Sequence, residues 1–261
     1  GVVESPLVLR AWFARISRAD LFAIMVMIMA TISGAILVLY ATTLSRTLPD
    51  AVGHMIVASL MSLPAAVLVA RLMVPPVDAV DTAPVEASLA YEGTMDALLK
   101  GISEGMQLVL AVIAVIITVF ALVNLVDQAL ALLPMVDGAP LTLRRGFGWA
   151  FAPLMWAIGV PWDQAPAAGS LMGTKVILNE YVAYLDLAAL PAGTLDGRSL
   201  LIISYALCGV ANLASVGLLV ATIAALAPER RADAAGLGMK SWLAGNLATL
   251  MTGAMIGLVS W

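Results

Sequence analysis

The stretch GTKVILNEYVAYLDL, residues 173–187, places Lys175, Asn179 and Glu180 close together between segments that are almost entirely apolar. A charged side chain is costly in apolar surroundings and persists there where it has a partner or a role. The stretch therefore raises two questions: which solvent surrounds this chain, and which groups contact the carboxylate of Glu180.

The composition answers the first question. Hydrophobic residues make up 62% of the 261 residues and charged residues only 11%, and the mean hydropathy is +1.02. Soluble domains carry about 25% charged residues, so this chain has too little polar material to cover a soluble exterior. We predict an all-α polytopic membrane protein that crosses the cell (inner) membrane several times and has the lipid bilayer as a partner.

The remaining composition excludes several classes of protein. The net charge of −4 and the lack of any Lys/Arg cluster argue against nucleic acid as a partner. Cys208 and His54 are each the single residue of their type, which excludes an intrachain disulfide and a Cys/His zinc site. The chain opens with GVVESP, without an initiator Met or a signal segment, and we expect a further N-terminal portion upstream.

A membrane-spanning helix needs about 20 mostly apolar residues. About five transmembrane helices follow from this length, over residues 21–44, 52–74, 102–133, 200–226 and 243–261. Residues 149–190 are also apolar but are interrupted by Pro and Gly, which predicts two half-helices in a re-entrant hairpin with its tip at 178–180.

These assignments divide the chain into six parts. They are the second half of a first, partial re-entrant hairpin (1–18), two transmembrane helices (19–76), a polar loop with an interfacial helix (77–101), a long transmembrane helix and loop (102–145), a second, complete re-entrant hairpin (146–192) and two final transmembrane helices (193–261). The positive-inside rule favours a cytoplasmic location for Arg10, Arg15, Arg18, Arg71, Lys100, Arg230, Arg231 and Lys240.

The two halves of the chain repeat one pattern. Glu4 lies beside Gly and Pro at a predicted hairpin tip, and the span after it is interrupted by ATISG at 30–34. Glu180 lies at the second tip, and the span after it is interrupted by CGVANLAS at 208–215. Small polar residues in these positions predict two spans broken at mid-membrane, the pattern of a secondary transporter with internal repeats. The alternative is that these polar residues only join helices through interhelical hydrogen bonds.

At these residues the chain closely resembles the concentrative nucleoside transporter family. The resemblance is carried by GVVESPLVLR (1–10), SRADLFAIMVMIMATISG (17–34), FAPLMWAIGVPWDQAPAAGSLMGTKVILNEYVAYLDLA (151–188), YALCGVANLASVG (205–217) and ALAPERRADAAGLGMKSWLAG (225–245). It implies a homotrimer whose protomers import nucleosides with sodium or protons through an alternating-access mechanism, with no enzymatic activity and no cofactor beyond the coupling ion.

The resemblance also implies site residues. Glu180, Asn212 and Ser215 would hold the ribose hydroxyls, and Glu4 would face the nucleobase. Thr31 and Ile32, at the first break, would supply ligands for the coupling cation. The other substrate-binding positions that it implies are Val2, Val3, Ile36 and Val210.

The chain departs from the family pattern at three of these positions. Val2 and Val3 stand where the family usually has Gln and Thr or Ser, and Val210 stands where it often has Phe. The first alternative is therefore a transporter of the same fold that carries a different small polar solute. An intramembrane hydrolase that uses Glu4 and Glu180 as an acid–base pair is the second alternative, and no Ser or His motif accompanies it. Lys175 is expected to pair with a carboxylate near the hairpin tip, in a structural role.

Overall fold

The computed structural model describes residues 1–2, 4–13, 15–76, 93–136 and 138–260. Within these residues all of the extended regular elements are helices, so the all-α prediction is confirmed. Their packing places α11 (Arg231–Val259) at the centre, in contact with α2 (Arg18–Ala30), α4 (Ala51–Met73), α9 (Gly197–Leu207) and α10 (Leu213–Leu226).

The first predicted break is present. Helix α2 ends at Ala30 and α3 (Gly34–Leu44) begins after three residues without helical structure. Thr31 and Ser33 have extended backbone angles, with ψ values of 167° and 137°. The Thr31 hydroxyl donates to the Met27 carbonyl oxygen at 2.9 Å. This bond supplies a partner for a carbonyl group in the last turn of α2, where the helix does not continue.

The second predicted break is also present, between α9 and α10. Asn212 caps α10, because its Oδ1 accepts a hydrogen bond from the Ser215 backbone N–H at 2.8 Å. Side chains from other helices satisfy two carbonyl groups beside the break: Lys175 Nζ donates to Ala206 O at 2.9 Å, and Asn246 Nδ2 donates to Ala211 O at 3.0 Å. The second break is therefore stabilised by packing as well as by its own sequence.

The two breaks lie against each other. A Cβ atom placed on Gly209 would be 2.9 Å from the Ala30 carbonyl oxygen and 2.6 Å from Thr249 Cγ2. No real Cβ tolerates such a separation from backbone, so glycine is required where the second break crosses the end of α2.

Residues 146–192 differ from the prediction of two half-helices. Helices α7 (Ala165–Ile177) and α8 (Glu180–Ala188) do meet at the expected 178–180, but a third helix, α6 (Leu143–Ala157), precedes them. Gly159, with φ of 109°, and the following Pro161 end α6 and turn the chain back, so that α6 packs on α7. A Cβ on Gly169 would overlap the Gly148 carbonyl oxygen, so this helix pair is very close.

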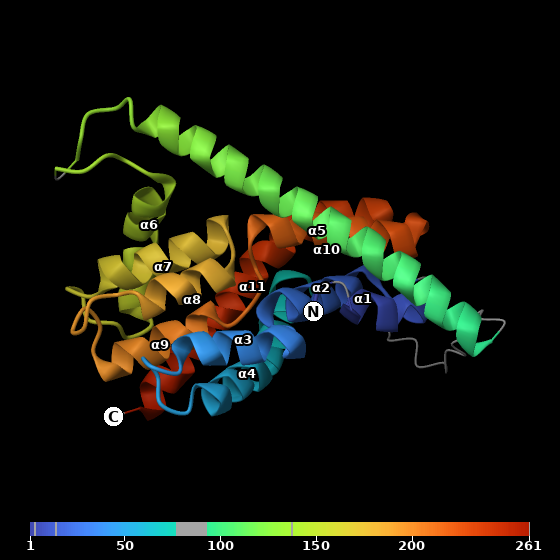
Figure 1. Ribbon diagram of the computed structural model, residues 1–261. Coiled ribbons are helices and arrows are strands. Elements are labelled where there is room, and N and C mark those ends of the chain that lie inside the picture. The colour runs from blue at the N-terminus through green and yellow to red at the C-terminus, as the bar shows by residue number, and fades with distance from the viewer. Residues whose placement is uncertain (3, 14, 77–92, 137, 261) are drawn as a thin grey trace.

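Helix α5 (Thr94–Leu130) is longer than the predicted span. It has 37 residues, and Figure 1 shows it crossing the outside of the molecule. At 1.5 Å per residue it is about 55 Å long, against about 30 Å for the bilayer core. Residues 94–101 are the first turns of this helix and not a separate interfacial helix, because no Pro interrupts them and Asp96 pairs with Lys100 one turn later at 2.8 Å. Residues 77–92 of that predicted segment lie outside the described residues.

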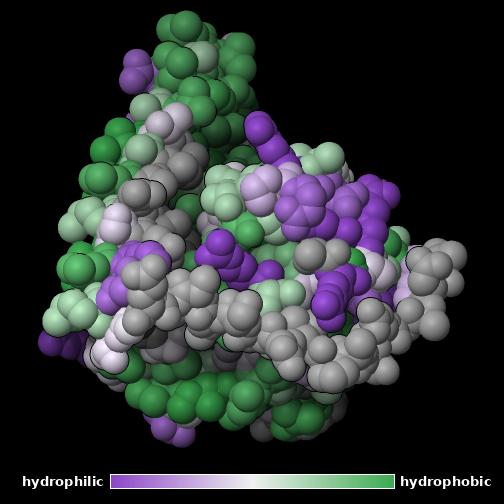
Figure 2. Space-filling model, turned by 90° about the vertical axis from the view of Figure 1, so that its right-hand side faces the viewer, coloured by the Kyte–Doolittle hydropathy of each residue, from purple (hydrophilic) through white to green (hydrophobic). Residues whose placement is uncertain are grey.

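The surface agrees with the composition. Ala51–Met73 and Pro228–Val259 are long and apolar enough to span a bilayer, in the part of the chain that the structure describes. Apolar side chains are exposed along α4, among them Val52, Ile56, Leu60 and Leu72. Figure 2 shows the face at the right-hand side of Figure 1, where hydrophilic side chains gather in the middle with apolar surface above and below.

Ion pairs join several helix ends at one end of the molecule. Arg71, near the end of α4, pairs with Asp20 at the start of α2 at 2.6 Å. Asp233, at the start of α11, pairs with Arg18 at 3.4 Å and with Arg230 at 3.5 Å. These ion pairs hold Arg18, Arg71 and Arg230 at one end of the molecule, and the sequence predicted that all three lie on the cytoplasmic side.

Candidate functional site

A cavity of about 400 Å³ lies between the two halves of the chain. Volumes of 300–1,000 Å³ are typical of small-molecule sites. Its walls come from the N-terminal residues with α1 (Glu4–Leu9), the first break with α3, the α7–α8 tip, and the second break with α10; they are lined by Gly1, Val2, Glu4, Ser33, Ile36, Leu39, Tyr40, Leu178, Asn179, Glu180, Tyr181, Val210, Asn212, Ala214, Ser215 and Leu218.

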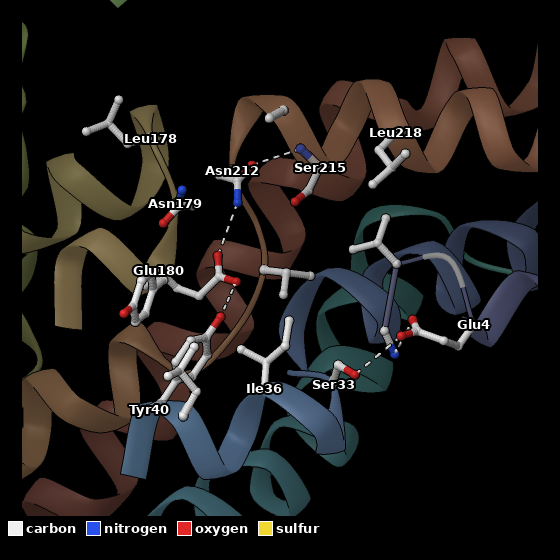
Figure 3. A pocket seen from close by; sticks show the side chains of 16 residues that line it. Glu4, Ser33, Ile36, Tyr40, Leu178, Asn179, Glu180, Asn212, Ser215 and Leu218 are labelled. Atoms are coloured by element: carbon white, nitrogen blue, oxygen red, sulfur yellow. Dashed lines mark hydrogen bonds and ion pairs between the residues drawn. The ribbon is translucent and has the colours of Figure 1, made fainter. Parts of the chain in front are cut away.

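Glu180 is the buried charged group of this cavity, with 6% of its surface exposed. It is the first residue of α8, and Asn179 caps that helix by accepting from the Val182 N–H at 2.9 Å. The carboxylate therefore lies at the positive end of the helix dipole, which stabilises negative charge. Figure 3 shows it pointing between Asn212 and Tyr40.

Two side chains from other helices donate to this carboxylate. Tyr40 Oη donates to Glu180 Oε1 at 2.7 Å, and Asn212 Nδ2 donates to Glu180 Oε2 at 3.2 Å. The orientation of the Asn212 amide is fixed at its other end, because Oδ1 accepts from the Ser215 N–H. The arrangement supplies a hydrogen-bonded carboxylate beside an amide and a hydroxyl, which is suited to a ligand that presents hydroxyl groups.

Four apolar side chains also line the cavity: Val2, Ile36, Val210 and Leu218, which we call its apolar side. Glu4 and Ser33 are two further polar groups of the lining. The Ser33 hydroxyl donates to Glu4 Oε1 at 3.5 Å, and 66% of the Glu4 side chain is exposed. Glu4 is thus a solvated carboxylate, in contrast to Glu180.

Most of the residues implied by the resemblance line this one cavity. They are Val2, Glu4, Ile36, Glu180, Val210, Asn212 and Ser215. Val3 lies outside the described residues. Thr31 and Ile32 are not among the lining residues: Thr31 Oγ1 is bonded to Met27 O, and Ile32 is buried. The described residues include no group of three or more His, Cys, Asp or Glu that could hold a metal ion.

Sequence reasoning missed Tyr40 and expected the wrong partner for Lys175. Tyr40 is 140 residues from Glu180, and the one local signal was a phenol in the apolar helix after the first break. Lys175 was expected to pair with a carboxylate, but its Nζ donates to Ala206 O and to Thr249 Oγ1, both at 2.9 Å. Its charge lies at the C-terminal end of α9, where the helix dipole favours a cation.

Known proteins resemble this chain along nearly its whole length. YutK of Bacillus subtilis (strain 168), an uncharacterized transporter, is 35% identical over 263 residues, which cover 99% of this chain and 64% of YutK. The putative nucleoside permease NupX of Escherichia coli (strain K12) is 32% identical over 266 residues, which cover 98% of this chain and 62% of NupX. This chain therefore spans less than two thirds of the length of these relatives.

A solved structure has the same fold. CNTnw in an inward-facing substrate-bound state matches with a TM-score of 0.81 and 36% identity, over 99% of this chain and 61% of that chain. The family model described as Na+ dependent nucleoside transporter C-terminus matches residues 54–257. This is a family of membrane transporters and not of enzymes, so the hydrolase alternative is dropped. The chain belongs to the concentrative, Na+-dependent nucleoside transporter family, of which it represents the C-terminal region.

Proposed function

We propose that the full-length protein imports nucleosides across the cell inner membrane by cation symport, with an alternating-access mechanism. The observation that carries this proposal is the Glu180 carboxylate, which is buried in the cavity and bonded to Asn212. An ionised carboxylate is an acceptor only, and its two oxygens can accept the two hydroxyl protons of a ribose diol. Asn212 and Ser215 complete the polar side of the cavity, and the sugar is expected there.

The coupling cation is expected at the first break. Where a helix is interrupted, backbone carbonyl groups lose their intrahelical partners, and hard oxygen ligands suit a small alkali cation. Thr31 and Ile32 stand at this interruption and are the proposed ligands within this chain. The family description favours Na+, with H+ as the alternative coupling ion.

In the membrane, α7 and α8 would form a re-entrant hairpin whose tip carries Asn179 and Glu180, and the residues before α2 would end a first hairpin that carries Glu4. Non-helical backbone at membrane depth, as at a hairpin tip, is tolerated where it is buried in protein or lines a cavity and does not contact lipid. The exposed apolar side chains of α4 and α5 would face lipid or the neighbouring subunits of a homotrimer.

A same-fold transporter of a different small polar solute is the second candidate. The observation that favours it is the apolar side of the cavity, where Val2 and Val210 offer no hydrogen bond to a base. The hydroxyl-binding side would be common to both candidates, so the discriminating feature is the group that the solute presents at the apolar side.

The proposal predicts the effect of Glu180→Gln in the full-length protein. The substitution keeps the shape of the side chain but replaces one acceptor oxygen with a donor, which cannot accept from a diol. Nucleoside uptake into proteoliposomes driven by a sodium or proton gradient should fall by about tenfold or more, a loss of at least about 1.4 kcal/mol. Oligomeric assembly, followed by size-exclusion chromatography, should be retained.

The matched control is Glu229→Gln, because Glu229 is exposed in the turn before α11 and far from the cavity. Wild-type uptake by Glu180→Gln would refute the assignment of the sugar site. If the wild type took up a non-nucleoside solute and no nucleoside, the second candidate, a transporter of a different small polar solute, would be favoured.

A further inference from the structure

The Glu180 carboxylate is held by a tyrosine from the other half of the chain. Tyr40, on α3, donates from its hydroxyl to Glu180 Oε1 at 2.7 Å, and its side chain lines the cavity. The contact joins the helix after the first break to the helix after the α7–α8 tip, and Tyr40 itself is only 1% exposed. Figure 3 shows the hydroxyl directed at the carboxylate.

Aromatic packing fixes the position of this hydroxyl. The Tyr40 ring stacks on Tyr181 with a centroid separation of 6.0 Å and lies 5.0 Å from the ring of Tyr184. Contacts at these separations are favourable and restrict the ring. The phenol therefore reaches Glu180 from a rigid support and not from a mobile side chain.

Tyr40 and Asn212 together determine the plane of the carboxylate. The last torsion of a glutamate side chain is broad, so packing along the chain alone does not orient the two oxygens. Tyr40 holds Oε1 while Asn212 holds Oε2, from two different helices. Each oxygen accepts one bond in this way and keeps capacity for another, which the cavity leaves to a ligand.

We propose that Tyr40 is a positioning residue that orients Glu180 for a substrate with two adjacent hydroxyl groups, and that it sets the preference for a diol over a single hydroxyl. This inference rests on the proposed function. A diol needs both carboxylate oxygens at defined positions, whereas a single hydroxyl is satisfied by one oxygen in a wider range of orientations.

The test compares two tyrosines of the full-length protein in proteoliposomes. Tyr40→Phe removes the hydroxyl that holds Glu180 and keeps the ring. Tyr184→Phe is the matched control, because Tyr184 is equally buried and packs on Tyr40, but its hydroxyl donates to Ser204 O at 2.9 Å. Inhibition constants are measured for uridine and for 2′-deoxyuridine, which lacks one hydroxyl of the diol.

Tyr40→Phe should weaken the binding of uridine by about 10- to 100-fold, the range expected for a lost hydrogen bond to a charged group, and the binding of 2′-deoxyuridine by less than about threefold. Tyr184→Phe should leave the ratio of the two constants at the wild-type value, even where it lowers the midpoint of thermal unfolding. A changed ratio in Tyr40→Phe alone supports the inference.

An unchanged ratio in Tyr40→Phe, or an equal change in both variants, would overturn it. Wild-type protein that binds neither nucleoside would instead overturn the proposed function, and this inference with it. Because the thermal midpoint of each variant is measured without substrate, a folding defect is separated from a change in selectivity.

Discussion

At the scale of single residues, the apolar side of the cavity limits how a nucleobase can be recognised. Val2 is buried and belongs to this side, and so does Val210 in the second break. A polar base edge that loses water there without gaining a partner would bind less tightly by roughly 1–3 kcal/mol per unsatisfied group. We therefore predict either weak discrimination among nucleobases or a preference for a base that is less polar than uracil.

Val2→Gln in the full-length protein tests this prediction. A glutamine at this position offers a donor and an acceptor to the base, so the affinity for uridine should rise by about fivefold, or roughly 1 kcal/mol. The measurement is competition between uridine and an analogue with an apolar base. Val2→Leu is the control, because it changes the size and adds no hydrogen bond. Strong wild-type preference for uridine, unchanged by Val2→Gln, would contradict the prediction.

Single residues also separate what the sequence could predict from what it could not. Asn212 and Ser215 were predictable, because small polar residues mark the break at 208–215 and the family resemblance implies these two as site residues. The bond between Tyr40 and Glu180 was not, since it joins residues 140 positions apart and depends on how two helices pack. The prediction for Lys175 was wrong for a related reason. Its charge indicated a carboxylate as the partner, but its ammonium group donates to a carbonyl group at the end of a broken helix.

At the scale of helices, the second break depends on α11. Thr249, on α11, accepts from Lys175 Nζ at 2.9 Å, and the same ammonium group donates to Ala206 O beside the break. Lys175 is fully buried. Removing an acceptor from a buried charged group is more destabilising than removing one from a neutral group, by about 1.5–3 against about 1 kcal/mol.

Thr249→Val is therefore predicted to lower the midpoint of thermal unfolding more than Thr252→Val does. Thr252 is a matched control, because it lies one turn further along α11 and is also buried, but its hydroxyl is bonded to Ala248 O and lies 3.3 Å from Ser62 Oγ. Thr249→Ser should recover most of the loss, since it restores the hydroxyl. Equal midpoints for the two valine variants would show that the ammonium group does not need Thr249.

Helix positions were predictable where the signal was local. Both breaks follow from Ser, Thr, Asn and Gly, whose side chains or backbone freedom compete with the helix. The additional helix α6 was not foreseen, because the Pro and Gly between residues 149 and 190 mark turns without saying which of them ends a helix. Pro153 lies inside α6, whereas Pro161 lies beyond its end.

At the scale of the whole molecule, charge distribution predicts the orientation in the membrane. The turn before α11, with Glu229, lies at the end where Arg18, Arg230 and Asp233 form ion pairs. The loop between α8 and α9 lies at the opposite end of the molecule, to the left in Figure 1. Basic residues are more frequent on the cytoplasmic side of a membrane protein. We predict that the turn is cytoplasmic and that the loop is external.

Single introduced cysteines test this orientation. Cys208 is the one cysteine of this chain and is completely buried, so it gives little background. Glu229→Cys and Ala192→Cys place exposed thiols in the turn and in the loop, in full-length protein from which any cysteine outside this chain has been removed. A membrane-impermeant maleimide should label Ala192→Cys in intact cells and Glu229→Cys only after permeabilisation. Labelling of Glu229→Cys in intact cells, with Ala192→Cys protected, would reverse the orientation and place Arg18 and Arg230 on the external side.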